Sequence, residues 1–160
     1  MYHRIVKWKL RRAFGDINAG RYERIVPQFA PQHRHVFYGE HALGGTRCGV
    51  EATRAWYGRL ARVFPDLHFE IRDIVVAGSP WRTVAMVEWV DRFAVNGVTG
   101  GNQGVHVFRL RWGRVVELSV YCDTDKLRRY LDAKATDGMV EATAAPITDR
   151  APLAPPSSRR

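Results

Sequence analysis

A carboxylate stands near the end of a candidate strand in "MVEWVDRFAVNG", residues 86 to 97. Side chains two residues apart on a strand share a face, so Asp91 lies on the same face as Trp89. If that face meets solvent, the charge of Asp91 is ordinary. If it lines a closed cavity, burying the charge is costly, and the residue becomes a candidate for proton transfer.

A histidine on the next candidate strand is the natural partner for this carboxylate. With the hairpin turn centred on Val98 and Thr99, antiparallel pairing places His106 directly opposite Asp91, with Cβ atoms about 4.5 to 5.5 Å apart. The following hairpin places Val120 opposite His106, in apolar surroundings. The pair predicts general acid/base chemistry, and the alternative is a hydrogen bond that merely satisfies two buried polar groups.

Other reactive side chains have simpler explanations. His33, His35 and His41 lack nearby acids or cysteines at metal-ligand spacing, so we expect no metal site. The glycines of "NGVTGGNQG" precede no helix, which favours a hairpin loop over a phosphate-binding loop. Asp123 precedes "TDKL", a position typical of a helix cap, although an acid at a pocket mouth is the alternative. We expect no cofactor.

The elements that carry these residues are predicted from hydrophobic periodicity. Helices are expected at 3–18, irregularly at 21–29 because of Pro27, at 49–64 and at 125–134; strands are expected at 33–40, 67–77, 82–95, 104–111 and 115–122. Helices before a run of strands indicate an α+β fold, in which three N-terminal helices pack on the concave face of a curved, mostly antiparallel, cone-shaped sheet.

Composition predicts one globular domain at 1–136 and a tail at 137–160, which is rich in Ala, Pro and Arg and expected to be flexible. The formal net charge is +9, but the basic residues form a clear cluster only in the first helix, so we expect no nucleic-acid partner. Cys48 and Cys122 are expected to be buried fillers. No run of about 20 apolar residues and no signal peptide is found, so we expect a cytoplasmic protein.

Three segments, "INAGRYERIVPQFAP", "GVEATRAWYGRL" and "HVFRLRWGRVVE", resemble the nuclear transport factor 2-like superfamily over roughly residues 5 to 132. This superfamily includes SnoaL-like polyketide cyclases, ketosteroid isomerase and limonene-type epoxide hydrolases. The resemblance implies a cone with a hydrophobic pocket, commonly in a dimer, and we expect a homodimer through the outer sheet face.

The family positions are only partly kept. The catalytic tyrosine and general-base aspartate of ketosteroid isomerase fall on Ala13 and Phe37, which excludes that machinery, whereas its supporting tyrosine and oxyanion-hole aspartate fall on Tyr57 and His106. The Arg-x-Asp pair of the epoxide hydrolases falls on Trp89 and Asp91. Their second aspartate falls on an apolar residue, Val120, so their reaction is improbable here.

The sequence therefore predicts a cofactor-independent cyclase or isomerase that acts on a small hydrophobic carbonyl compound, such as a polyketide or terpenoid intermediate. The expected catalytic residues are Asp91, His106 and Tyr57, and the expected substrate-binding residues are Trp89, Phe37, Phe108, Leu118 and Val120. Two alternatives stay open: a non-catalytic small-molecule-binding or dimerisation module, and an epoxide hydrolase or epoxide-opening cyclase with altered machinery.

Overall fold

The computed structural model describes residues 1 to 149. Its α-helices are α1 (Tyr2–Asn18), α2 (Val50–Val63) and α3 (Thr124–Thr136). Its strands are β1 (Phe29–Phe37), β2 (Gly45–Gly49), β3 (His68–Ser79), β4 (Arg82–Val95), β5 (Val98–Gly100), β6 (Gln103–Arg111) and β7 (Arg114–Cys122). Short 3-10 helices occupy Tyr22–Arg24, Val26–Gln28 and Val140–Thr143.

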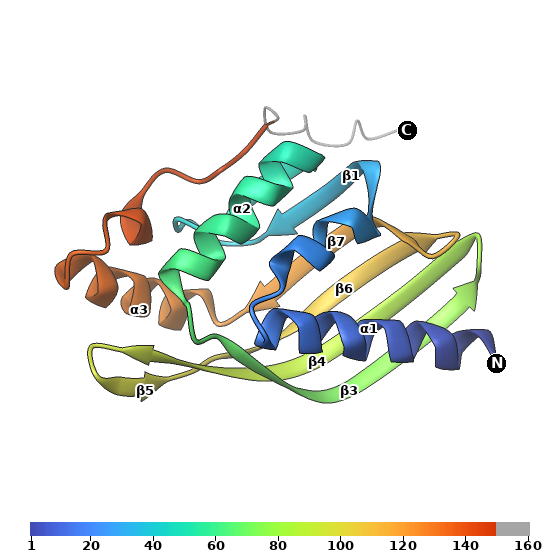
Figure 1. Cartoon of the computed structure of the whole chain (residues 1–160), viewed down its shortest axis with the longest axis horizontal. Coiled ribbons are helices and arrows are strands. Elements are labelled where there is room, and N and C mark those ends of the chain that lie inside the picture. The colour runs from blue at the N-terminus through green and yellow to red at the C-terminus, as the bar shows by residue number, and fades with distance from the viewer. Residues whose placement is uncertain (150–160) are drawn as a thin grey trace, which may run out of the picture.

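The strands form one curled sheet in the order β2-β1-β7-β6-β4-β3, with β5 paired to the end of β4. All neighbours are antiparallel except β1 and β7, which are parallel. Helices α1 and α2 lie over the same face of this sheet (Figure 1). The predicted α+β fold with a cone-shaped, mostly antiparallel sheet is confirmed.

The helical layer differs from the prediction in its second element. The predicted helix at 21–29 is instead two 3-10 helices, Tyr22–Arg24 and Val26–Gln28, followed by the first residue of β1, and Pro27 stands at the start of the second. Proline lacks an amide donor, and its ring clashes with the preceding turn inside an α-helix, so the segment is broken into short pieces. Val26 is nevertheless buried, as the apolar spacing of the segment predicts.

Helix α1 covers the sheet with one apolar stripe. Its buried apolar residues recur at steps of three and four, which places them on one helical face: Val6, Leu10, Phe14 and Ile17. Ile5 and Trp8 belong to the other face and are exposed. The helix therefore contributes a single apolar wall, with Phe14 near its C-terminal end.

The hairpin between β4 and β6 turns at a different place from the predicted one. Val95 pairs with Val98 across a two-residue turn at Asn96 and Gly97, whose φ values are 50° and 79°. Asn-Gly is strongly favoured in such turns because both residues tolerate positive φ. The signal lies in the sequence, and the expected turn at Val98 and Thr99 was wrong.

The domain extends beyond residue 136. Ala142 is buried in the core, Glu141 pairs with Arg62 at 2.7 Å, and the Asp149 carboxylate accepts the amide hydrogens of Cys48 and Gly49 at 2.7 and 2.6 Å. Residues 137–149 therefore form a strap over α2 and β2 rather than the free tail that was expected. The remainder of that predicted tail, 150–160, lies outside the described residues.

Among residues 1 to 149, no helix combines the length and the apolar character that crossing a bilayer requires.

Candidate active site in the apolar cavity

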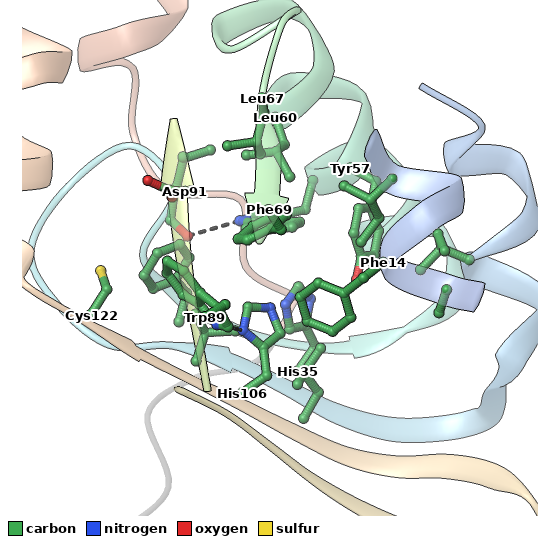
Figure 2. A pocket seen from close by; sticks show the side chains of 18 of the residues that line it. Phe14, His35, Tyr57, Leu60, Leu67, Phe69, Trp89, Asp91, His106 and Cys122 are labelled. Carbon is green, nitrogen blue, oxygen red and sulfur yellow. Dashed lines mark hydrogen bonds between the residues drawn. The ribbon is translucent and has the colours of Figure 1, made fainter. Parts of the chain in front are cut away.

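A cavity of about 70 Å³ lies between the concave face of the sheet and helices α1 and α2 (Figure 2). Every residue predicted to be catalytic or to bind substrate contributes to its lining: Asp91, His106, Tyr57, Trp89, Phe37, Phe108, Leu118 and Val120. The rest of the lining is mainly apolar. The alternation of side chains along β4, β6 and β7 explains this convergence, since the inward residues are two apart on each strand.

Asp91 marks one end of the cavity. Its Oδ1 accepts the backbone amide hydrogen of Asn102 at 2.5 Å, and its own amide donates to the Asn102 carbonyl oxygen at 2.9 Å. Burial raises the pKa of the Asp91 carboxyl to about 6, against smaller opposing effects of the Asn102 amide and the charge of Lys126. A carboxylate with a pKa near neutrality is well suited to general-base work.

Asp91 and His106 share a face, as predicted, but they are not opposite each other. His106 pairs with Val87, because the hairpin turns at Asn96 and Gly97. At about 3.4 Å per residue and 4.8 Å between strands, roughly 14 Å separates the two Cα atoms. Trp89 lies between them (Figure 2). The predicted direct acid/base pair is therefore wrong, and so is the alternative of a mutual hydrogen bond.

His106 instead pairs with the tryptophan beside it. Trp89 donates its indole Nε1–H to Nδ1 of His106 at 2.6 Å. An indole nitrogen can only donate, so Nδ1 holds the lone pair and the proton of the neutral ring lies on Nε2. Burial lowers the pKa of His106 to about 3. The ring therefore stays neutral at physiological pH and offers the cavity an N–H donor.

Tyr57 reaches the cavity from α2. It is buried, and burial raises the pKa of its phenol above the ordinary value of 10.0, so the hydroxyl keeps its proton. Its ring stacks on that of His35 with centroids 5.8 Å apart and planes 12° apart. Tyr57 therefore lines the cavity with a protonated hydroxyl, and its role as a donor stays a prediction.

Sequence reasoning missed two residues of this site. Asn102 fixes the Asp91 carboxylate through its backbone, and His35 lines the cavity from β1. His35 was considered only as a metal ligand, although it stands two residues before Phe37 and so shares its inward face. Within residues 1 to 149 no group of three His, Cys, Asp or Glu side chains is placed to hold a metal.

Cys122 also reaches the cavity, near Asp91. Burial and the charges of Asp91 and Asp123 raise the pKa of its thiol to about 12, which keeps it protonated and unreactive. Asp123 caps α3 by accepting the Lys126 amide hydrogen at 2.9 Å, as predicted, and does not line the cavity. Among the described residues, Asp91 is therefore the one carboxylate of the lining.

Solved structures share the fold. An NTF2-like protein of unknown function from Burkholderia pseudomallei K96243 matches with a TM-score of 0.67 and 22% identity, covering 78% of this chain and 95% of that one. TerC, co-crystallised with polyporic acid, gives 0.60 and 18%, covering 75% and 92%. A putative polyketide cyclase from Sinorhizobium meliloti gives 0.53 and 18%, covering 68% and 88%.

A search of curated proteins found no match. Among protein-family models, the SnoaL-like domain matches residues 10 to 118, which is more than half of the chain and includes α2 and most of the sheet. The curled sheet and its covering helices agree with that assignment. The chain thus belongs to the SnoaL-like domain family, within the nuclear transport factor 2-like superfamily.

Proposed function

We propose that this protein is a cofactor-independent general acid/base enzyme, a cyclase or isomerase that acts on a small hydrophobic carbonyl compound. One observation carries the proposal: Asp91, a carboxylate with a pKa near 6, opens into the same apolar cavity as the neutral N–H donor of His106. Such pairs of groups, kept in different protonation states by their surroundings, are typical of acid/base sites.

The chemistry divides between the two ends of the cavity. Asp91 removes a proton from carbon, and the Nε2–H of His106 and the hydroxyl of Tyr57 stabilise the negative charge that develops on the carbonyl oxygen. Protonated Asp91 then returns the proton to a different carbon. Because Trp89 separates base from donor, a substrate that engages both groups at once extends past the indole ring, whereas a small ketone at that end meets Asp91 alone and reports only on the base.

The family supports this proposal by analogy. The structural relatives include a putative polyketide cyclase and a protein crystallised with polyporic acid, but at 18% identity their shared fold does not transfer a reaction. Asp91 and His106 belong to this chain's own geometry, and the proposal rests on them.

The size of the cavity favours a second candidate, a non-catalytic binding or dimerisation module. Ligand sites typically enclose about 300 to 1,000 Å³, whereas this cavity measures about 70 Å³. A substrate must therefore displace lining side chains such as Leu10, Phe14 and Phe69. If they do not yield, the cavity stays closed, and the polar groups serve only the fold.

The epoxide-opening alternative receives less support. It requires an acid that protonates the epoxide oxygen, and burial keeps the proton of Tyr57 firmly in place while His106 is already neutral. Trp89 also occupies the position of the arginine found in the epoxide-hydrolase pattern. Asp91 alone does not supply both a base and an acid in one step.

Hydrogen–deuterium exchange tests the proposal without knowledge of the natural substrate. Cyclohexanone and cyclohex-3-enone are incubated with the protein in D₂O, and NMR follows α-exchange and isomerisation to the conjugated enone. We expect catalysis by the unmutated protein and its loss in Asp91→Asn, with cyclohexanone affinity and melting temperature retained. Binding without exchange supports the non-catalytic module, and equal exchange by both proteins rules out Asp91 as the base.

A further inference from the structure

His35 is enclosed at the end of the cavity opposite Asp91. Its relative exposure is 0%, and its Nε2 has no hydrogen-bond partner among the described residues, although the ring lines the cavity. Buried polar atoms are nearly always paired, so an orphaned nitrogen on a ring that borders a cavity calls for an explanation. None of the chemistry assigned to Asp91, His106 and Tyr57 uses this nitrogen.

The other ring nitrogen of His35 is occupied by a buried arginine. Arg47 donates Nε–H to Nδ1 of His35 at 3.3 Å. Arginine has no acceptor atom, so Nδ1 holds the lone pair and the proton lies on Nε2. Burial, and then the nearby Arg47 charge, lower the pKa of His35 well below its ordinary value of 6.5. The free Nε2 is therefore an N–H donor on a ring that stays neutral.

Arg47 is itself held so that its orientation is fixed. Its guanidinium donates to the carbonyl oxygens of Gly44, Gly45 and Ile147, each at 2.9 Å, and its central carbon lies 5.2 Å from the ring centroid of Trp56. Burial lowers the pKa of Arg47 to about 10, so it remains a cation at neutral pH. A cation hydrogen-bonded to one side of an imidazole makes the N–H on the other side a stronger donor.

We propose that the Nε2–H of His35 binds an oxygen acceptor of the ligand, and that Arg47 is the positioning residue that fixes this donor. His35, His106 and Tyr57 then give the cavity three donors against one carboxylate at the far end. The ligand class is an uncharged or anionic molecule with carbonyl, enolate or phenolate oxygens. Cationic amines are disfavoured at this end, because the buried charge of Arg47 repels a cation.

This inference deepens the proposed function and shares its cavity, but it concerns binding and does not depend on Asp91 chemistry. A simpler occupant is water, because a cavity of about 70 Å³ is large enough to hold it and a bound water would satisfy His35. A ligand-selective response at His35 distinguishes the two explanations.

The test uses two probes of nearly the same shape, cyclohexanone and methylenecyclohexane, in which a carbonyl oxygen replaces a methylene group. In protein with ¹⁵N-labelled histidine, NMR of the imidazole nitrogens identifies the tautomer of His35 and follows its Nε2 resonance. We expect the Nε2–H tautomer, a shift of Nε2 on adding cyclohexanone, and no comparable shift with methylenecyclohexane. No saturable binding of cyclohexanone, or an unmoved Nε2 resonance as for a bound water only, overturns the proposal.

Variants then measure the contribution of each residue. In His35→Phe, the dissociation constant of cyclohexanone should rise roughly tenfold relative to that of methylenecyclohexane, which corresponds to the loss of one hydrogen bond. Leu118→Met is the matched control, because Leu118 pairs with His35 across β1 and β7 and offers no donor. It should change both affinities alike, and an equal change of both in His35→Phe contradicts the proposal.

Arg47→Met tests the positioning role. We expect the ¹⁵N spectrum to show a mixture of His35 tautomers, with weaker cyclohexanone binding and retained methylenecyclohexane binding. An unchanged tautomer assigns Arg47 to the fold alone. If either variant fails to fold, the spectra of the unmutated protein still decide. If Asp91→Asn abolishes hydrogen–deuterium exchange while cyclohexanone still shifts the His35 Nε2 resonance, both the base role of Asp91 and the binding role of His35 are supported. Retained exchange contradicts only the first, and an unmoved resonance contradicts only the second.

Discussion

The two ends of the cavity differ in how their polar groups are held. At one end Asp91 is half-buried and bound by a single backbone amide, and its pKa of about 6 lets it change charge near neutral pH. At the other end His35 and Arg47 are fully enclosed, and their protonation is fixed by burial and by each other. The comparison teaches that one end is suited to exchanging protons and the other to presenting unchanging donors.

The largest expected effect is on turnover, at the end of the cavity that holds Asp91. If Asp91 acts as base, its rate follows the ionised fraction, so turnover should fall about tenfold per pH unit below pH 6 and level off above it. Exchange kinetics of cyclohexanone between pH 4 and pH 8 measure this profile. His35 and Arg47, at the other end, should add no inflection to the pH–rate profile in that range. A second inflection would contradict the proposed difference between the two ends.

Replacing Arg47 tests how much its buried hydrogen bonds contribute to the stability of the fold. Arg47→Met leaves the carbonyls of Gly44, Gly45 and Ile147 and the Nδ1 of His35 without their donor, and we expect a loss of about 3 kcal/mol in unfolding free energy. Urea denaturation measures it. Arg62→Met is the control, because Arg62 is an exposed arginine of α2 and its surface pair with Glu141 should contribute much less to stability. Equal losses in both would show that burial of Arg47 gives it no special role.

Shortening the strap should have a smaller effect. A chain ending at residue 136 loses the Ile147 carbonyl, the Asp149 contacts and buried Ala142, and we expect about 2 kcal/mol less stability than in a chain ending at 149. Thermal denaturation of the two chains, compared with the full chain, isolates residues 137–149. Identical melting temperatures of the chains ending at 136 and at 149 would show that residues 137–149 do not stabilise the domain, which would then end at residue 136.

The smallest effect is the pH dependence of stability through Asp91. Its folded pKa of about 6 lies above the ordinary 3.8, so between about pH 4 and pH 6 the folded protein holds a proton that the unfolded chain has released. Stability should therefore fall as pH rises through this window, by about 1 kcal/mol after allowing for partial exposure of the carboxyl. Asp91→Asn should flatten that slope in urea titrations, and an unchanged slope assigns it to other groups.

Local sequence patterns predicted most of the helices and long strands, but they missed two short strands and the broken helix at 22–28. The apolar stripe of α1 and the alternation of β4 follow from repeat lengths of 3.6 and 2, which the chain carries locally. The strands β2 and β5 were missed because they are short and rich in glycine. The 3-10 pair at 22–28 reflects Pro27, a signal that was noticed but whose outcome depends on packing.

The sequence correctly predicted that Asp91 and His106 lie on the inward face of the sheet, but it wrongly predicted that they pair with each other. A shift of the turn by two residues preserves which side chains point inward, because the strand repeat is two, but it moves each one along its neighbour. Asp91 and His106 therefore stayed on the concave face while His106 moved to Val87 and bonded to Trp89. The Asn96-Gly97 pair was the local signal that would have corrected the register.

Local sequence patterns indicated the inward face of β4 and the apolar character around Asp91, because alternation acts between residues close in the chain, and the fold family followed from the resemblance of three segments to known proteins. Only the tertiary structure decided the proton positions on His35 and His106 and the burial of Arg47. These depend on contacts between residues distant in sequence, such as Arg47 with Ile147, whose hydrogen bonds form only when the cone closes.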